Sequence, residues 1–517
     1  MKVVRIMIIM GIWAILPAQQ MVWKYIANEG VSEKGKEIVY SPNDNIICAG
    51  GDSYYPNYQT DIMFIGLNPS GQKIGGPVFY STYDIEILRD MVLGSNGIIY
   101  ACGAVNMFDY LPNMESDFLV GAITTAGSPQ WAYVYDEAWD EAYSVVQGRD
   151  GNIYACGIVM LWDYPPLFTN SDIFVLSLTS QGNLRWQYRY ENGGYQYKKH
   201  DKAKSIVYGG DNNIYVAGYI SSGEGSQYED LAVLSFTPSG NLRWIYLYNG
   251  SGNSTDEAND VIWNNNKIYV TGFSIGNGTQ KDVILICLDT LGNKIWEYRY
   301  NNSSNSNDEA YKIIMGLDGN LYLTGYTYVN NVQNILVISI DTLGNERWVY
   351  NGPSGAGLSL IYVWEKIYIT GYTLSSNNYK DISTICLDTQ GNELWFFSYN
   401  GAMNRNDEGE DITYGVNGNL YICGISREDD EINDDFIVIN LHDSLWVKIK
   451  ENKNKENEEI NFPIPIFMSL KNFNKDLKFK IFDKLGRKIN EPKSDELYFI
   501  TFKKGDEIIK RKTLRLK

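Results

Sequence analysis

The residues of this chain that could do acid–base chemistry are neighbouring carboxylates. An Asp-Glu pair followed by Ala or Gly recurs before apolar segments, at Asp140-Glu141, Asp256-Glu257, Asp308-Glu309 and Asp407-Glu408. Two positioned carboxylates can act as general acid and general base. A pair that returns at the same point of a repeated phrase is more typical of a turn or a strand entry. The pattern therefore predicts a structural role for these pairs.

Other chemistry-bearing side chains are scarce. The two histidines, His200 and His442, stand in no metal or nucleophile motif. Most of the six cysteines occupy equivalent positions of different repeats, which predicts small buried apolar side chains too far apart for disulfides. The turns Asp150-Gly151-Asn152 and Asp318-Gly319-Asn320 leave Ca²⁺ binding open as a minor alternative to plain hairpins. From this inventory we predict no catalytic residue, no resident cofactor and no enzyme activity.

The loops between the second and third segments of each repeat are where the repeats differ. In the first three repeats these loops are aromatic. Exposed aromatic side chains on loops of a rigid scaffold are typical of glycan and protein contact sites, although aromatic and Pro residues also simply anchor long loops. The predicted binding residues are Tyr54, Tyr55, Tyr58, Phe108, Tyr110, Trp162 and Tyr164.

These loops belong to a phrase that occurs eight times along the chain. Each copy holds four short segments rich in Ile, Val and Tyr, separated by Asp, Asn and Gly turns, without a sustained helical period. Four strands per repeat are typical of propeller blades. The sequence therefore predicts an all-β fold, namely an eight-bladed β-propeller of four-stranded blades followed by a small C-terminal β-sandwich. The anchoring glycines of the copies are Gly50, Gly103, Gly157, Gly218, Gly272, Gly325, Gly371 and Gly424.

A Trp stands at one fixed depth of the fourth segment in most copies. A large ring that recurs at one position is best explained as packing between neighbouring blades. Trp23 precedes the first complete copy, and the last copy lacks its fourth segment, so the segment around Trp23 is predicted to close the ring and remove two open sheet edges. Leu445-Trp446-Val447 is the alternative closing segment. The recurring residues are Trp23, Trp131, Trp186, Trp244, Trp296, Trp348 and Trp395.

The repeated phrase resembles a known family. Asp-Glu-Ala, the segment Gly-Asn-Leu-Tyr-Leu-Thr-Gly from Gly319 to Gly325, and Gly-Asn-x-x-Trp together resemble the bacterial SBBP-type β-propeller repeat over residues 21–446. Leu-Asp-Thr-x-Gly-Asn-x-x-Trp is also similar to the tryptophan-docking repeat of pyrroloquinoline-quinone propellers. That family often has adjacent cysteines in its cofactor pocket, and no two cysteines here are neighbours. Both resemblances imply the fold and neither implies one activity, because propellers host many functions.

The two ends of the chain predict export. Residues 1–18 combine basic residues with a short apolar run, as in a secretory signal peptide. Residues 19–449 then form the propeller and residues 450–461 a charged linker. Residues 462–517 resemble the type A-like C-terminal sorting domain of type IX secretion substrates, although Asp495-Glu496 replaces the usual Gly. This resemblance implies contact with the secretion machinery, and it depends on Gly486, Arg487, Tyr498 and Phe499.

Composition limits the partners. The formal net charge of −18 argues against nucleic-acid binding, and beyond the leader no apolar stretch is long enough to span a membrane. We predict an extracellular or outer-surface monomer, with a periplasmic location as the alternative, that binds a glycan or an extracellular protein without catalysis. The alternative function is a secreted enzyme or sensor with a Ca²⁺ or quinone-type ligand in the central channel. An enzyme should gather carboxylates, Arg or Lys at the channel mouth.

Overall fold

The computed structural model describes the chain from residue 19 to residue 443 and four strands between residues 479 and 515. Within the first range the description excludes residues 28–31, 55–59, 81–84, 108–115, 138, 163–168, 192–199, 222–227, 417 and 429–432. The chain divides into two compact units, Met1–Val447 and Lys448–Lys517.

The repeats of the first unit fold into four antiparallel strands. One copy consists of β18 (Asp256–Asn264), β19 (Lys267–Ile275), β20 (Lys281–Asp289) and β21 (Lys294–Tyr300). The two middle strands are buried on both faces, because neighbouring sheets cover them from both sides, and this explains their continuous runs of Ile, Val and Leu. The outer strand β21 keeps exposed positions.

Three further sheets have the same size. The first holds β10 (Asp140–Gln147), β11 (Ile153–Trp162), β12 (Thr169–Leu178) and β13 (Leu184–Tyr190). The second holds β14 (Lys202–Tyr208), β15 (Ile214–Ser221), β16 (Glu229–Phe236) and β17 (Leu242–Tyr248). The third holds β29 (Glu408–Tyr414), β30 (Asn419–Ser426), β31 (Asp435–Asp443) and β1 (Gln19–Ala27).

The remaining strands of this unit form two longer sheets, each made of two such four-stranded groups. In one sheet, a single parallel pair between Thr60 and Ile85 joins the groups. In the other sheet, the long strand β25 (Glu346–Val363) is the outermost strand of one group through its first half and the innermost strand of the next through its second half. The first sheet holds β2 (Ser32–Ser41), β3 (Ile46–Tyr54), β4 (Thr60–Leu67), β5 (Lys73–Tyr80), β6 (Ile85–Leu93), β7 (Ile99–Met107), β8 (Asp117–Ile123) and β9 (Pro129–Tyr135). The second holds β22 (Asp308–Met315), β23 (Leu321–Val329), β24 (Val332–Ile340), β25, β26 (Lys366–Leu374), β27 (Lys380–Asp388) and β28 (Glu393–Tyr399).

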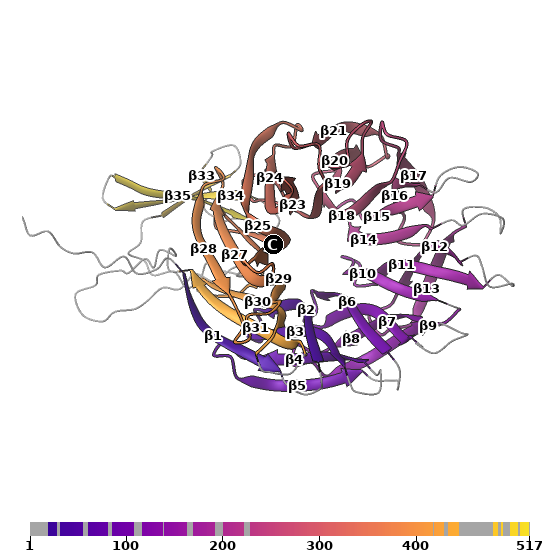
Figure 1. Ribbon diagram of the computed structural model, residues 1–517, viewed down its shortest axis with the longest axis horizontal. Coiled ribbons are helices and arrows are strands. Elements are labelled where there is room, and N and C mark those ends of the chain that lie inside the picture. Colours follow the sequence, from indigo (N-terminus) through magenta and orange to yellow (C-terminus); the bar gives the residue numbers. More distant parts are fainter. Residues whose placement is uncertain are drawn as a thin grey trace, which may run out of the picture. The chain divides into compact units, whose positions relative to one another are not determined.

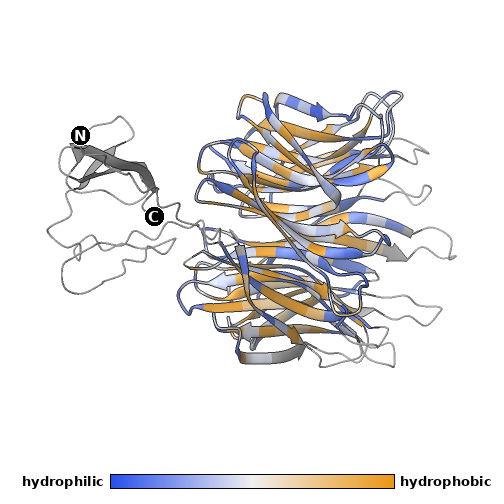
Figure 2. Ribbon diagram, turned by 60° about the vertical axis from the view of Figure 1, so that its left-hand side comes forward, coloured by the Kyte–Doolittle hydropathy of each residue, from blue (hydrophilic) through white to orange (hydrophobic). Residues whose placement is uncertain are grey.

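The four-stranded groups stand around a central channel as the blades of a β-propeller (Figure 1). Each blade takes the name of its innermost strand: β2, β6, β10, β14, β18, β22, β25 or β29. Apolar clusters fill the spaces between neighbouring blades, and Figure 2 shows the hydrophobic residues concentrated within the strands. The core is therefore a series of inter-blade layers around the channel.

The N-terminal strand β1 completes the β29 blade. It pairs with β31 in antiparallel register, with Trp23 opposite Asn440. The first described strand is therefore the outermost strand of the last blade, and this ties the two ends of the ring together. Trp446, at the centre of the alternative closing segment, lies outside the described residues.

The recurring Trp residues lie between neighbouring blades. Trp186 in β13 packs onto a turn of the β14 blade, where its Nε1 donates a hydrogen bond to the Pro238 carbonyl oxygen at 2.9 Å. Gly240 in that turn has a φ of 88°, and an added Cβ would lie 2.6 Å from the Trp186 ring. Glycine there both adopts the positive φ and leaves room for the ring. The equivalent hydrogen bond is made by Trp23, Trp131, Trp244, Trp296 and Trp348, and Trp395 is buried in β28.

The first repeat departs by one residue from the predicted alignment. Gly157 of the β10 blade lies opposite the residue before a bulge of the innermost strand, and the equivalent residue of the β2 blade, opposite Gly35, is Gly51. The anchor of the first repeat is therefore Gly51, and the prediction of Gly50 is wrong. Gly50 has no side chain because Leu88 of the next blade fills that space: an added Cβ would lie 2.7 Å from Leu88 Cδ2.

The described strands of the second unit form one antiparallel sheet in the order β33-β32-β34-β35. They are β32 (Phe479–Asp483), β33 (Lys488–Ile489), β34 (Leu497–Lys504) and β35 (Glu507–Arg515). The predicted Tyr498 and Phe499 lie in β34, whereas Gly486 and Arg487 lie outside the described residues. A second sheet, which a sandwich requires, is not among the described strands, so the sandwich stays a prediction.

Candidate functional site in the central channel

A β-bulge at the same position of every innermost strand delivers side chains to the channel. In β2, Gly35 lies opposite Gly51 and Glu37 lies opposite Gly50, so Lys36 between them has no partner in the ladder. A bulge re-aims the unpaired side chain away from the sheet, and on an innermost strand it points toward the channel. The bulge residues, here called the bulge ring, are Lys36, Arg89, Tyr143, Lys204, Asn259, Tyr311, Leu358 and Glu410.

A cavity of about 330 Å³ opens at this level of the channel. Its lining comes from the innermost strands β2, β6, β22, β25 and β29. It contains three cationic side chains, two carboxyl groups and one phenol, a mixture that can hydrogen-bond a polar ligand from several sides. The lining residues are Lys36, Glu37, Leu88, Arg89, Tyr311, Lys312, Leu358 and Glu410.

The residues that follow the bulges form a second layer, here called the polar belt: Glu37, Asp90, Ser144, Ser205, Asp260, Lys312, Ser359 and Asp411. The belt aspartates connect neighbouring blades. Asp90 Oδ2 accepts hydrogen bonds from Ser144 Oγ and the Val145 amide of the next blade, both at 2.8 Å. Asp260 binds Ser205 of the blade before it and the backbone amide of Ile313 in the blade after it. These aspartates are therefore committed to holding the innermost strands together.

Asp411 closes this network across the junction between the last and first blades. It accepts hydrogen bonds from Ser359 Oγ at 2.7 Å and from the Ile38 amide at 3.1 Å, and it also hydrogen-bonds Glu37. Burial and the charges of Asp411 and Asp90 raise the pKa of Glu37 well above its usual value. Burial thus favours the protonated form of Glu37, and the hydrogen bond between the two carboxyl groups needs one such proton.

Lys312 is the one cation of the polar belt. Its side chain is exposed to the channel, and the charges of carboxyl groups on other blades, led by Asp260, raise its pKa although desolvation lowers it. Among the described residues, no carboxylate lies within the 4.0 Å of an ion pair from Lys312 Nζ. Lys312 is therefore a fully charged ammonium group held by long-range attraction alone.

The Asp-Glu pairs divide between two tasks. Asp256 accepts a hydrogen bond from the Gly250 amide at 2.6 Å, and Asp407 accepts one from the Gly401 amide at 2.7 Å, so the aspartates hold the strand entries. Three of the four glutamates instead reach the bulge ring of the preceding blade, whereas Glu408 forms an ion pair with Lys380. Asn259 Nδ2 donates to Glu309 at 3.0 Å. The predicted structural role therefore describes the aspartate of the pair but not the glutamate, because the glutamate lies beside the candidate site.

Glu141 and Glu257 behave like Glu309. Arg89 forms an ion pair with Glu141, and Lys204 with Glu257. Lys202 Nζ lies 3.6 Å from the centre of the Tyr143 ring, and burial lowers the pKa of Lys202 to about 8. On the opposite side of the channel, burial and the charge of Glu408 raise the pKa of Glu410 to about 7. The channel mouth therefore holds a base and an acid that titrate near neutral pH.

The strands β3 and β11, which precede two of the predicted aromatic loops, end beside the starts of the innermost strands β2 and β10. Tyr54, at the end of β3, lies opposite Ser32, at the start of innermost strand β2. Tyr54 is half-buried, and Lys34 Nζ lies 5.2 Å from the centre of its ring. Trp162 ends β11, and its backbone alone is described. The predicted Tyr55, Tyr58, Phe108, Tyr110 and Tyr164 lie outside the described residues.

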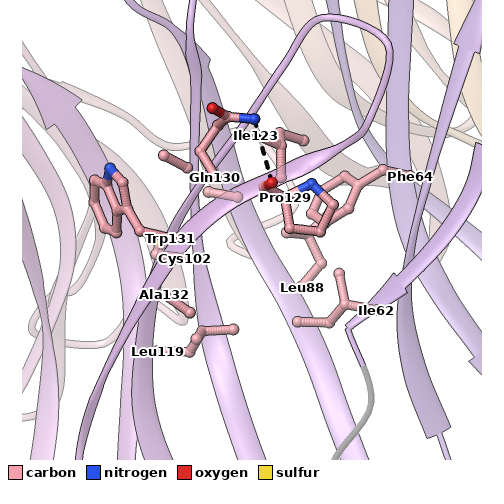
Figure 3. Close-up of a pocket in the computed structure, with 13 residues that line it drawn as sticks. Ile62, Phe64, Leu88, Cys102, Leu119, Ile123, Pro129, Gln130, Trp131 and Ala132 are labelled. Carbon is pink, nitrogen blue, oxygen red and sulfur yellow. Dashed lines mark hydrogen bonds between the residues drawn. The ribbon is translucent and has the colours of Figure 1, made fainter. Parts of the chain in front are cut away.

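A second cavity, of about 170 Å³, lies between the β2 and β6 blades and is almost wholly apolar. Figure 3 shows Ile62 and Phe64 of β4 facing Leu119 of β8 across it. It exists because Gly121 takes a position that holds Leu or Ile in the other blades, such as Leu176 opposite Ala155. An added Cβ at Gly121 would meet only the Trp131 carbonyl oxygen, at 3.5 Å.

The β2 blade also lacks the aromatic pair of its neighbours. In the β10 blade, Tyr154 and Trp186 flank Ser177 and their rings lie 6.0 Å apart. The corresponding positions of the β2 blade are Cys48, Gly66 and Gly75. The turn of the next blade fills part of this space, since Ala126 lies against both glycines.

The following sequence candidates make packing or turn contacts in the described part of the chain. All six cysteines are buried and unpaired, as predicted. Asp150 accepts hydrogen bonds from the Asn152 amide and the Tyr154 hydroxyl, so its carboxylate caps its own turn. No group of three or more His, Cys, Asp or Glu suited to a metal ion occurs among the described residues. His200 exchanges backbone hydrogen bonds with Ser221. No helix within the described ranges is long and apolar enough to cross a membrane.

Comparisons with known proteins find likeness in structure but not in sequence. No family model and no curated protein sequence matches this chain. Among solved structures, the periplasmic gluconolactonase PpgL of Pseudomonas aeruginosa is similar at a TM-score of 0.42 and 10% identity, over 71% of this chain and 96% of that one. The acylaminoacyl peptidase of Pyrococcus horikoshii gives 0.40 and 11%, over 75% and 57%. The propeller domain of the Trilobed protease from Pyrococcus furiosus gives 0.38 and 7%, over 70% and 98%.

The prediction that this chain is not an enzyme is corrected by these findings. Two of the similar solved structures are a gluconolactonase and an acylaminoacyl peptidase, so a propeller scaffold is no ground for denying catalysis. The likeness concerns the fold, and at these TM-scores it says nothing about what this chain does. The channel also gathers the carboxylates, Arg and Lys that the sequence inventory did not bring together.

The bulge ring escaped the sequence prediction, although a signal was present. The residue after Asp-Glu-Ala or Asp-Glu-Gly varies while the residues before it repeat: Tyr143, Asn259, Tyr311 and Glu410. A position that varies inside a repeated phrase is free of the scaffold's demands. Here it marks the side chains that face the channel.

Proposed function

We propose that this protein is an exported eight-bladed β-propeller that binds a glycan at the mouth of its central channel. The observation that carries the proposal is the bulge ring, which directs a different side chain from each innermost strand into one channel. Mixed carboxyl, ammonium, guanidinium and phenol groups around one cavity suit a ligand with many hydroxyl groups, because each hydroxyl both donates and accepts hydrogen bonds. The count of eight blades rests on the strand groups and on β1 as the closing strand.

The aromatic loops extend the proposed surface. The first of them follows Tyr54, which ends β3 beside the start of the innermost strand β2. A glycan chain with its terminal sugar in the cavity would run outward over these loops, where aromatic rings stack on sugar faces. The export route belongs to the proposal as well: a signal peptide over residues 1–18, SBBP-type repeats and a type IX sorting domain in the second unit.

The test is a glycan array probed with the full chain and with variants of two regions. Tyr311→Phe removes a hydroxyl from the cavity, and the triple variant Tyr55→Ala/Tyr110→Ala/Trp162→Ala removes rings from the loops. Lys294→Gln, on the exposed outer strand β21, serves as the matched surface control. We expect glycan binding that weakens in both test variants and persists in the control. Binding of a protein partner without any glycan signal would refute the glycan proposal.

A second candidate function is acid–base catalysis on the same ligand. It is favoured by Glu410, whose pKa burial raises to about 7, and by Lys202, whose pKa burial lowers to about 8, since groups that titrate near neutral pH transfer protons efficiently. The check is to incubate each bound glycan with the full chain and follow its products by mass spectrometry. Turnover that Glu410→Gln abolishes without loss of binding supports catalysis. Binding without any product refutes it.

A further inference from the structure

We infer that the channel cavity selects an anionic saccharide and binds its carboxylate or sulfate group through Lys36, Arg89 and Lys312. The sugar part of this inference rests on the proposed glycan function, whereas the anion site rests on the cavity itself. The three cations come from three different blades, β2, β6 and β22, and face one cavity of about 330 Å³. That volume is at the small end of ligand sites and suits a single sugar unit.

Lys312 is the side chain most available to a ligand. It is exposed to the channel, and none of the described carboxylates lies within ion-pair distance of its ammonium group. An ammonium group that no side chain neutralises directly gains most from an incoming anion, because the surrounding protein weakens water screening. Lys36 is nearly as available, since its nearest ion-pair partner, Asp52, lies at 3.9 Å. Arg89 is partly neutralised by Glu141 and supplies planar donors at the cavity wall.

The cations outnumber the carboxyl groups in the cavity lining. Asp90, Asp260 and Asp411 accept hydrogen bonds from serines and backbone amides, and none of them lines the cavity. The lining holds two carboxyl groups, those of Glu37 and Glu410, and burial raises the pKa of both, which favours their neutral forms. Three cations therefore face the cavity in a chain whose formal net charge is −18.

This contrast favours selectivity for acidic sugars. An anion is repelled by most of an acidic surface, so favourable binding is confined to the place where cations converge. A neutral sugar gains hydrogen bonds in the cavity but leaves the ammonium group of Lys312 without a partner. A uronic acid or a sugar sulfate satisfies both needs, since its hydroxyls bind the polar groups while its anion binds the cations.

The experiment is calorimetric titration of the full chain with sodium glucuronate, glucose 6-sulfate and glucose. We expect the two anionic sugars to bind at least about tenfold more tightly than glucose, because a hydrogen bond to a charged group is worth about 1.5–3 kcal/mol. Lys312→Gln and Lys36→Gln should each remove most of that preference, and Lys294→Gln should retain it. Added salt should weaken the binding of the two anionic sugars and leave the binding of glucose unchanged. Unfolding midpoints of all variants show whether each is folded.

The outcomes separate this inference from the proposed function. Equal affinity for glucose and glucuronate, or a preference that survives both lysine substitutions in folded variants, overturns the anion site even if glycans bind. Glucuronate binding that depends on Lys312, together with a blank glycan array, upholds the anion site and refutes the glycan function. Preference for sulfate over carboxylate, or the reverse, identifies which acidic sugar the cavity accepts.

Discussion

Replacing Glu37 by glutamine measures whether the polar belt stores a proton. Glu37 lines the channel cavity and hydrogen-bonds Asp411, and burial together with the charges of Asp411 and Asp90 raises its pKa well above 4.5. Glutamine has the same shape and donates an N–H where the carboxylic acid donates an O–H. The variant therefore keeps the contact with Asp411 and removes only the titration.

The sign and size of the effect follow from linkage. The folded pKa of Glu37 lies above its unfolded value, so its contribution to stability is complete below about pH 4.5 and is lost as the pH rises through the folded pKa. Above pH 4.5 the wild-type chain must bind a proton on folding, and the variant need not. Relative to wild type, the variant should gain about 1.4 kcal/mol of unfolding free energy per pH unit between pH 4.5 and the folded pKa of Glu37.

The assay is urea unfolding of both proteins at pH 4.5, 6 and 7.5, followed by tryptophan fluorescence. Glu297→Gln, at an exposed position of β21, controls for the loss of one acidic residue. Glu37→Ala completes the set, because losing a hydrogen bond to the charged Asp411 should cost about 1.5–3 kcal/mol at pH 4.5. A stability gap between Glu37→Gln and wild type that stays constant with pH would show that Glu37 is ionised in the fold, and the reasoning about the belt would be wrong.

Three further substitutions test the frame around the channel. Trp23→Ala should cost about 3–5 kcal/mol, since it leaves a cavity at the closing strand, and hydrogen exchange should rise first in β31; exchange that rises evenly across all blades would contradict the closing role of β1. Gly121→Val should stabilise the protein by about 0.5–2 kcal/mol in thermal unfolding, because it fills the apolar cavity beside Leu119; a loss of stability would show that the cavity cannot take a side chain. Burial raises the pKa of Asp52 to about 6, so its contribution to stability is complete below about pH 4 and is lost by about pH 6. Relative to wild type, Asp52→Asn should therefore gain about 3 kcal/mol of unfolding free energy between these two pH values. A difference in stability that does not change with pH would place the pKa of Asp52 at the ordinary value.

The fold was largely predictable because the same strand and turn pattern occurs in many copies of the repeat. Strand order, Gly-Asn turns and the all-β class follow from patterns that several copies share, so an error in one copy is corrected by the others. The first repeat shows the limit of this reasoning. Gly50 and Gly51 are adjacent, and only strand pairing shows that Gly51 is the anchor, since the need for Gly50 comes from Leu88 on another blade.

The candidate site was much less predictable. Lys36, Arg89 and Lys312 are far apart in the sequence. They line one cavity only because the ring brings their three strands to one channel. The bulges that direct these side chains into the channel depend on backbone pairing, and residue types do not predict where a bulge lies. A polar residue at such a position therefore looks like an ordinary exposed strand residue until the strands are paired.

Departures from the repeat gather at the junction of the β2 and β6 blades. The other blades place Gly or Ala before the bulge, and the β6 blade places Leu88 there, with Gly50 opposite it to make room. Leu88 lines both cavities and so forms the wall between the apolar space and the channel. The same two blades supply Lys36 and Arg89 to the channel.

A purely structural role of the propeller does not explain why these two blades differ from the others. The other blades show that Tyr, Trp and Leu at the standard positions pack this fold, as Tyr154, Trp186 and Leu176 do in the β10 blade. Giving up Tyr and Trp in the β2 blade and Leu in the β6 blade sacrifices packing that would stabilise the ring. Such a sacrifice is expected where a site needs its own shape. The junction of the β2 and β6 blades is therefore where binding and substitution experiments on this protein have most to reveal.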